Sequence, residues 1–174
     1  MDNFAEQLVK RSETGSDKTR RVLMVIVGVL FTLSLALLSV TQLSRPVMAL
    51  FGFILTVVAG FGTFHIVQNT FVEYEYTFTN GELDVDKIIA KKKRRPMTST
   101  NIRQLTDFGK YDDGMEESPD MTVIMATDNI ASHEYFADFT DEELGSARLI
   151  FCPDERMLEN VKRSLPARLR SKLQ

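Results

Sequence analysis

The chain has 174 residues, of which 44% are apolar and 26% charged, with a formal net charge of -3. Residues 22–70 hold one formal charge, Arg45, so 20 of the 21 Lys and Arg and all 24 Asp and Glu lie elsewhere. This distribution excludes a single soluble globule and a largely buried multi-span transporter. The acidic balance argues against nucleic-acid binding, and a lone cysteine, Cys152, excludes an internal disulfide or a multi-cysteine zinc site.

Two apolar segments follow a charged leader, residues 1–21. Residues 22–43 and 46–68 carry no charge, and at about 1.5 Å per helical residue each spans roughly the 30 Å of a bilayer core. The short Ser44-Arg45-Pro46 turn between them predicts a transmembrane helical hairpin over residues 22–70. The alternative for the first segment, a signal peptide, has a shorter apolar core of about 7–15 residues.

Basic residues flank the predicted hairpin on one side. Five precede the first span, one lies in the turn, and six lie between Lys87 and Arg95. Because cytoplasmic flanks are enriched in Lys and Arg, we expect a multi-pass protein of the bacterial cell membrane with both termini cytoplasmic.

Small residues recur at four-residue spacing on both predicted spans: Gly28, Thr32 and Ala36 on the first, and Gly52, Thr56 and Gly60 on the second. Such residues let helix backbones approach closely. A hairpin centred on Ser44 would pair Gly28 with Gly60, Thr32 with Thr56 and Ala36 with Gly52. The alternative is that these residues reflect only the usual composition of membrane helices.

His65, near the end of the second span, is either a proton-relay group or an imidazole at the membrane interface. Neither span contains an acidic residue, which favours the interfacial interpretation. The same lack of carboxylates argues against a pump or an ion-coupled transporter made from one chain.

An alternating pattern begins after the second span, in the predicted cytoplasmic domain of residues 71–174. Residues 72–78 alternate in polarity as a half-buried strand does, and Asn80-Gly81 is a two-residue hairpin signal. The turn predicts a register in which Phe78 faces Leu83 and Val72 faces Ile89. It also places Glu75 opposite Asp86, a repulsive pair that the sequence does not explain.

The second strand of this hairpin returns toward the membrane and leads into five basic residues: Lys91, Lys92, Lys93, Arg94 and Arg95. We expect them to contact anionic lipid headgroups, although a topology signal alone would also explain them. A second basic group, at residues 162–172, is interpreted as a solvated tail.

Further short strands and one helix complete the domain. Residues 121–127 and 134–140 are expected to form a hairpin across Asp128-Asn129, and residues 147–151 a further strand. A helix is expected from Pro153, with an apolar stripe of Met157, Leu158, Val161 and Leu165. About six strands followed by a C-terminal helix indicate an α+β domain.

The segment YEYTFTNGELDVDK from Tyr74, placed after two spans and followed by a basic run and Ile102-x-x-Leu105, resembles bacterial pleckstrin-homology-like membrane proteins. Together with the leader MDNFAEQLVK, the whole chain resembles an uncharacterised family of small two-span proteins from Gram-positive bacteria. The resemblance implies a bent β-sheet closed by a C-terminal helix, and a binding or scaffolding role. Seven strands are usual in such domains, and the one not yet assigned would lie within residues 91–108.

Residue patterns typical of catalysis or of cofactor binding are missing from the sequence. It has no phosphate-binding glycine loop, no paired metal-ligating histidines and no calcium-loop spacing, and Cys152 is interpreted as a half-buried structural thiol. We therefore expect no enzyme, cofactor, metal or small-molecule substrate. The first hypothesis is a membrane-anchored binding or scaffold module, whose partners are the bilayer and anionic lipid headgroups or an unidentified protein. The alternative is an accessory subunit of a membrane complex or transporter, with the hairpin as its interface.

Overall fold

The computed structural model describes residues 3–112, 114–115, 118–128, 130 and 133–171. The chain folds into two units: residues 13–71 form one, and the segment ending at Ser12 joins the segment starting at Val72 to form the other.

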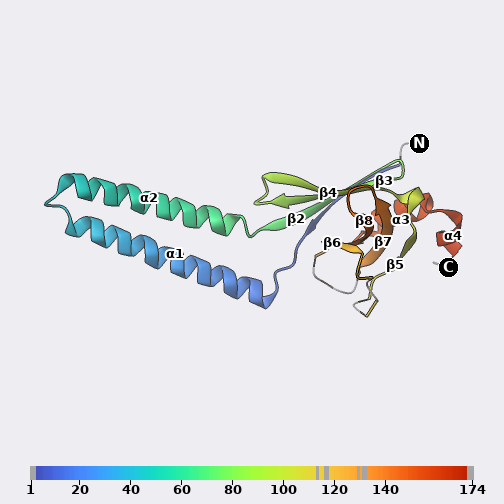
Figure 1. Ribbon diagram of the computed structural model, residues 1–174, viewed down its shortest axis with the longest axis horizontal. Coiled ribbons are helices and arrows are strands. Elements are labelled where there is room, and N and C mark those ends of the chain that lie inside the picture. The colour runs from blue at the N-terminus through green and yellow to red at the C-terminus, as the bar shows by residue number, and fades with distance from the viewer. Residues whose placement is uncertain (1–2, 113, 116–117, 129, 131–132, 172–174) are drawn as a thin grey trace. The chain divides into compact units, whose positions relative to one another are not determined.

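The first unit is an antiparallel pair of helices, α1 (Gly15–Thr41) and α2 (Pro46–Gln68) (Figure 1). Both are long and apolar enough to cross a membrane, which fits a two-span membrane protein. Proline at the first position starts α2 at the predicted residue. Helix α1 begins at Gly15, before the predicted span, and the Asp17 side chain accepts a hydrogen bond from the Thr14 backbone amide (3.4 Å) at this helix start.

The first part of the leader, up to Ser12, is also part of the folded domain, which corrects the predicted division at residue 71. Its residues Phe4–Lys10 form strand β1, which pairs antiparallel with β2 (Val72–Thr79) from Phe4 opposite Thr79 to Lys10 opposite Glu73. The buried side chains of Ala5 and Val9 alternate with exposed ones, as in a half-buried strand. The helical hairpin is thus inserted between the first two strands of the domain.

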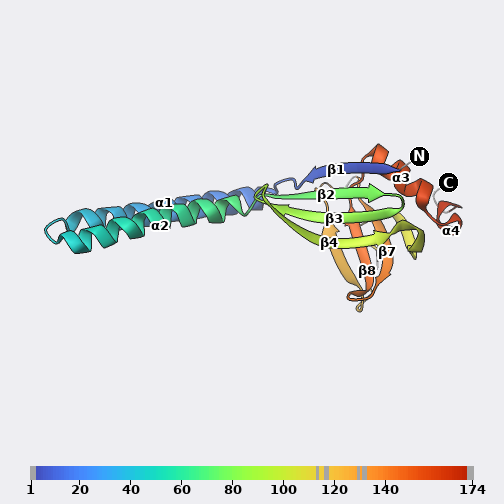
Figure 2. The ribbon, with the colours of Figure 1, turned by 90° about the horizontal axis from the view of Figure 1, so that it is seen from above.

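The first sheet has the order β1-β2-β3-β4, with β3 at Glu82–Ile89 and β4 at Lys93–Asn101 (Figure 2). The predicted register of the β2–β3 hairpin is confirmed, including Phe78 opposite Leu83 and Glu75 opposite Asp86. Asn80 and Gly81 have φ of 53° and 103°, the positive values that a tight hairpin turn needs. Strand β4 lies in residues 91–108, where a further strand was expected.

The second sheet has the order β5-β7-β8-β6, and here the predicted hairpin of residues 121–140 is wrong. Its strands are β5 (Asp107–Lys110), β6 (Thr122–Ala126), β7 (Tyr135–Asp141) and β8 (Gly145–Phe151). Strand β8 pairs antiparallel with β7 and parallel with β6, so it separates the two strands that were expected to pair. Of the predicted turn, Asn129 lies outside the described residues.

The core of the domain lies where the two sheets and the C-terminal helix meet. A short η1 turn (Ile102–Gln104) links β4 to β5, and α3 (Glu155–Ser164) and α4 (Ala167–Arg170) follow β8. Asp154 caps α3 by accepting a hydrogen bond from the Met157 amide (2.7 Å). The predicted stripe residues Met157, Val161 and Leu165 are buried, and Leu158 packs against the same core. The α+β class with a C-terminal helix is confirmed.

Candidate functional site

The helices of the hairpin pack through small residues, in a register about one turn away from the predicted one. The backbone at Gly28 lies against Thr63, that at Gly52 against Ser39, and that at Gly60 against the Thr32 methyl group. The predicted pairs Gly28–Gly60 and Ala36–Gly52 are therefore replaced. Thr63 and Ser39 were missed because they lie outside the four-residue stripes.

The hydroxyl groups in this interface bond within their own helices. Thr32, Ser39, Thr56 and Thr63 each donate to the carbonyl four residues earlier, at 2.7 to 2.9 Å. Each hydroxyl is therefore satisfied without a partner across the interface. This leaves shape, rather than hydrogen bonding, to hold the two helices together.

Arg21 joins the two ends of the hairpin. Its guanidinium forms an ion pair with Glu13, donates to Thr70 Oγ1 (3.0 Å) and lies 4.1 Å from the centre of the Phe71 ring. A planar, multi-donor guanidinium can make all three contacts at once, which an ammonium cannot. An apolar recess of about 340 Å³ lies farther along the helices, lined in part by Met24, Val27 and Ile66.

The predicted basic segment lies at the β3–β4 turn and at the start of β4. All five side chains from Lys91 to Arg95 are exposed, and Ala90 and Lys91 have positive φ values of 54° and 57°. Lys91, Lys92, Lys93 and Arg95 make no ion pair with any residue that the structure describes. Ile89, which precedes this turn, pairs with Val72 at the start of β2. The turn therefore lies at the same end of the sheet as the connection from α2 to β2.

Arg94 differs from its neighbours because it bonds inside the domain. It contacts the buried Glu75 carboxylate at 2.8 and 2.9 Å. This ion pair accounts for the Glu75–Asp86 juxtaposition that the sequence did not explain, since Arg94 offsets the repulsion. Glu75 and Arg94 line a groove of about 510 Å³ together with the carboxylates of Asp84, Asp86, Asp141 and Glu143.

The second basic group is used within the domain rather than forming one free cationic surface. Arg168 donates to the Leu105 carbonyl (2.7 Å), Arg170 to the Leu165 carbonyl (2.9 Å), and Arg163 pairs with Glu159 (2.6 Å). Of the same group, Lys172 lies outside the described residues.

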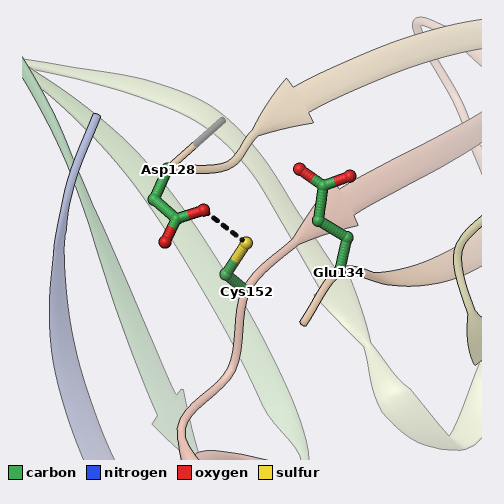
Figure 3. Close-up of side chains that lie close together, drawn as sticks. All are labelled: Asp128, Glu134 and Cys152. Carbon is green, nitrogen blue, oxygen red and sulfur yellow. Dashed lines mark hydrogen bonds between the residues drawn. The ribbon is translucent and has the colours of Figure 1, made fainter. Parts of the chain in front are cut away.

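Three side chains that can bind metals meet where β6 and β8 end and β7 begins (Figure 3). Asp128 follows β6, Glu134 precedes β7 and Cys152 follows β8. The Cys152 thiol donates to Asp128 Oδ1 (3.4 Å), which also accepts from the Ile130 amide (2.9 Å). Burial first, and then the neighbouring carboxylates, raise the pKa of the Cys152 thiol to about 12. Without a bound cation, the thiol is therefore neutral near pH 7 and a poor nucleophile.

Residues from β1 and β2 support this cluster. The Tyr76 hydroxyl donates to the Ala126 carbonyl and accepts from the Cys152 amide (3.3 Å), and burial raises the pKa of Tyr76. The Gln7 side chain donates to the Cys152 carbonyl (2.9 Å) and accepts from the Asp154 amide (2.8 Å). No linear spacing marks Asp128 and Glu134, so the sequence did not indicate that they would join Cys152.

The comparisons with known proteins agree with the domain architecture. A family model described as "Bacterial PH-like domain (DUF6106)" matches residues 1–171. No curated protein and no solved structure matches the chain. The match includes β1, both apolar helices and the domain that follows. The family model therefore covers the hairpin together with the domain that it interrupts. The chain therefore belongs to this family of bacterial PH-like domains.

Proposed function

We propose that the protein is a membrane-anchored binding or scaffold module, whose helical hairpin holds the PH-like domain at the inner surface of the bacterial cell membrane. The role is recognition of a partner protein or of anionic lipid headgroups, with no catalytic step.

The observation that carries this proposal is the insertion of the hairpin between two neighbouring strands. β1 ends at Lys10 and α1 begins at Gly15, while α2 ends at Gln68 and β2 begins at Val72. At no more than about 3.5 Å per residue, these connections reach at most about 18 Å and about 14 Å. A domain tethered twice through such short connections is restricted to the membrane surface, as a surface-bound recognition module requires.

The charge distribution supports an inward-facing domain. β1 precedes the first span and β2 follows the second, and their pairing requires both to lie on the same side of the membrane. The basic leader and the basic β3–β4 turn favour the cytoplasmic side for that shared compartment. Both termini are then cytoplasmic, and Arg45 lies in the turn outside the cell.

The four basic side chains without an ion pair support a lipid-facing turn. Lys91, Lys92, Lys93 and Arg95 lie at the sheet end that continues into the helices. Basic residues close to an anionic leaflet each gain about 1 kcal/mol at low ionic strength. The turn, at the sheet end that continues into the helical hairpin, therefore suits contact with anionic lipid headgroups.

An accessory subunit of a membrane complex is the second candidate, and the apolar recess between the helices favours it. The recess would accept an apolar side chain of a neighbouring transmembrane helix.

One experiment separates the two candidates. Partners are captured by chemical crosslinking in native membranes, first with the full chain and then with residues 15–68 replaced by an unrelated two-span hairpin of equal length. Capture of the same protein by both chains supports the binding module. Loss of that protein on replacement, with the hybrid still folded in the membrane, overturns it in favour of the accessory subunit.

A further inference from the structure

Asp128, Glu134 and Cys152 form a cluster of potential metal ligands. One oxygen of each carboxylate and the Cys152 sulfur all lie within 4.8 Å of one another. Asp128 and Glu134 lie near the two ends of the β6–β7 connection, and Cys152 begins the β8–α3 connection. The parallel β6–β8 pair and the antiparallel β7–β8 pair bring them to the same edge of the sheet. Figure 3 shows the Glu134 and Asp128 side chains on opposite sides of the Cys152 sulfur.

The Glu134 carboxylate provides a second, independent indication of a ligand. The residue is only 7% exposed, yet its carboxylate has no hydrogen bond or ion pair with any residue in the described ranges. A carboxylate with so little access to water is costly unless a hydrogen-bond donor or a cation compensates it. Cys152 is equally buried, at 7% exposed, and no Lys or Arg among the described residues forms an ion pair with the cluster. A bound cation would compensate both carboxylates.

The separation of the three atoms suits a small tetrahedral ion. With bonds of about 2.3 Å to sulfur and about 2.0 to 2.2 Å to oxygen, tetrahedral ligand atoms lie roughly 3.3 to 3.7 Å apart. The sulfur and Asp128 Oδ1 are already 3.4 Å apart. Small side-chain rotations would bring the Glu134 oxygen to the same range.

We propose that Asp128, Glu134 and Cys152 bind one divalent cation of the zinc class, with water as the fourth ligand. A thiolate disfavours the hard cations magnesium and calcium, whereas zinc and cobalt accept sulfur and carboxylate ligands together. The ion joins the end of β6, the start of β7 and the end of β8. It thereby fixes the β8–α3 connection, to which the Gln7 side chain of β1 is bonded.

The test uses the full chain purified in detergent, stripped of metal with a chelator and titrated with cobalt(II) chloride. Coordination by a thiolate adds a sulfur-to-cobalt charge-transfer band in the near ultraviolet. Because Cys152 is the only cysteine in the chain, this band reports on the proposed site alone. We expect one equivalent of cobalt to bind, zinc chloride to displace it, and zinc to raise the Tm of the full chain.

Variants identify the ligands. Glu134→Gln and Asp128→Asn keep the size of each side chain and should each weaken cobalt binding by at least about tenfold, since even outer partners of metal ligands contribute 10- to 100-fold. Cys152→Ser should abolish the band. The control is Glu155→Gln, an exposed carboxylate near Cys152 in sequence, which should bind cobalt as the unmodified chain does.

Two results would overturn the proposal. One is a folded chain that shows no charge-transfer band and no zinc-dependent rise in Tm. The other is a band that persists with unchanged affinity in both Glu134→Gln and Asp128→Asn, which would mean adventitious binding to the thiol. The carboxylate variants keep the proposal testable even if Cys152→Ser does not fold.

Discussion

The Asp138–Arg148 ion pair lies inside the second sheet, where the two residues face each other across β7 and β8. The guanidinium donates to both carboxylate oxygens, at 2.7 and 2.8 Å, and lies over the Phe136 ring at 4.9 Å. Both side chains are buried, so losing either charge is costly to the other.

Replacing Asp138 with Asn should lower the free energy of unfolding of the domain by about 3–5 kcal/mol, because the buried guanidinium of Arg148 would lose the carboxylate that it contacts through two hydrogen bonds. Chemical denaturation of the full chain in detergent, followed by circular dichroism of the strands, measures this change. Glu143→Gln, at an exposed position after β7, is the control and should change the stability by less than about 0.5 kcal/mol. An equal loss in both variants would contradict the role assigned to the pair.

The Cys152 thiol should react slowly with alkylating reagents, because only the thiolate is nucleophilic and the pKa is raised to about 12. In the presence of a chelator, the rate with iodoacetamide should rise about tenfold per pH unit between pH 8 and 10, without levelling off near 9. In denaturant, where the pKa returns to its usual value, the rate should level off near pH 9. A plateau near pH 9 in the folded chain would show that the thiol is not perturbed.

At the scale of the elements, the helical hairpin depends on how closely its backbones approach. A Cβ atom added at Gly52 would overlap the Ser39 side chain and lie 3.2 Å from the Ser39 Cα atom. A Cβ atom added at Gly60 would make an ordinary contact of 3.7 Å with the Thr32 methyl group. The two glycines lie on the same helix, so they form a matched pair.

Gly52→Ala should therefore separate the helices and destabilise the hairpin by about 1–3 kcal/mol, the usual cost of overpacking. Gly60→Ala should be neutral or slightly stabilising, because alanine favours the helix and fits the space. Denaturation in mixed micelles, monitored by helical circular dichroism, compares the two variants. Equal stability of both would mean that the small residues do not set the approach of the helices.

The elements that local patterns specify were predictable, and those that depend on distant segments were not. Asn80-Gly81 and the alternation around it determine the register of β2 and β3, because turn type and burial act within a few residues. β1 was not recognised because its pairing partner lies beyond the helical hairpin in sequence. The β6–β7 prediction failed for a related reason, since a parallel partner arrives only with β8. The same tertiary pairing assembles Asp128, Glu134 and Cys152, so no local signal marked them.

At the scale of the whole molecule, the chain is a domain interrupted by an apolar helical hairpin. β1 is synthesised before both spans, yet it finds its partner β2 only after they have been made. Its Gln7 side chain then bonds to the backbone at Cys152 and Asp154, near the other end of the sequence. The pairing of β1 with β2 therefore requires both ends of the helical hairpin to lie on the same side of any membrane that it crosses.

The proposed contact of the β3–β4 turn with lipid can be tested in the intact chain. In vesicles whose anionic lipid carries a photoreactive headgroup, crosslinks should concentrate on the peptide that contains residues 91–95. Lys92→Gln should reduce the yield there about fivefold at low salt, the equivalent of about 1 kcal/mol, and added salt should reduce it in every variant. Lys162→Gln is the matched control, because it also removes one lysine, but from α3. Helix α3 lies near the end of β1 that is opposite Lys10, since its Arg156 contacts Phe4 there. This control variant should leave the yield at residues 91–95 unchanged. Equal crosslinking yields at residues 91–95 in the unmodified chain and in both variants would mean that these basic residues serve only as a topology signal.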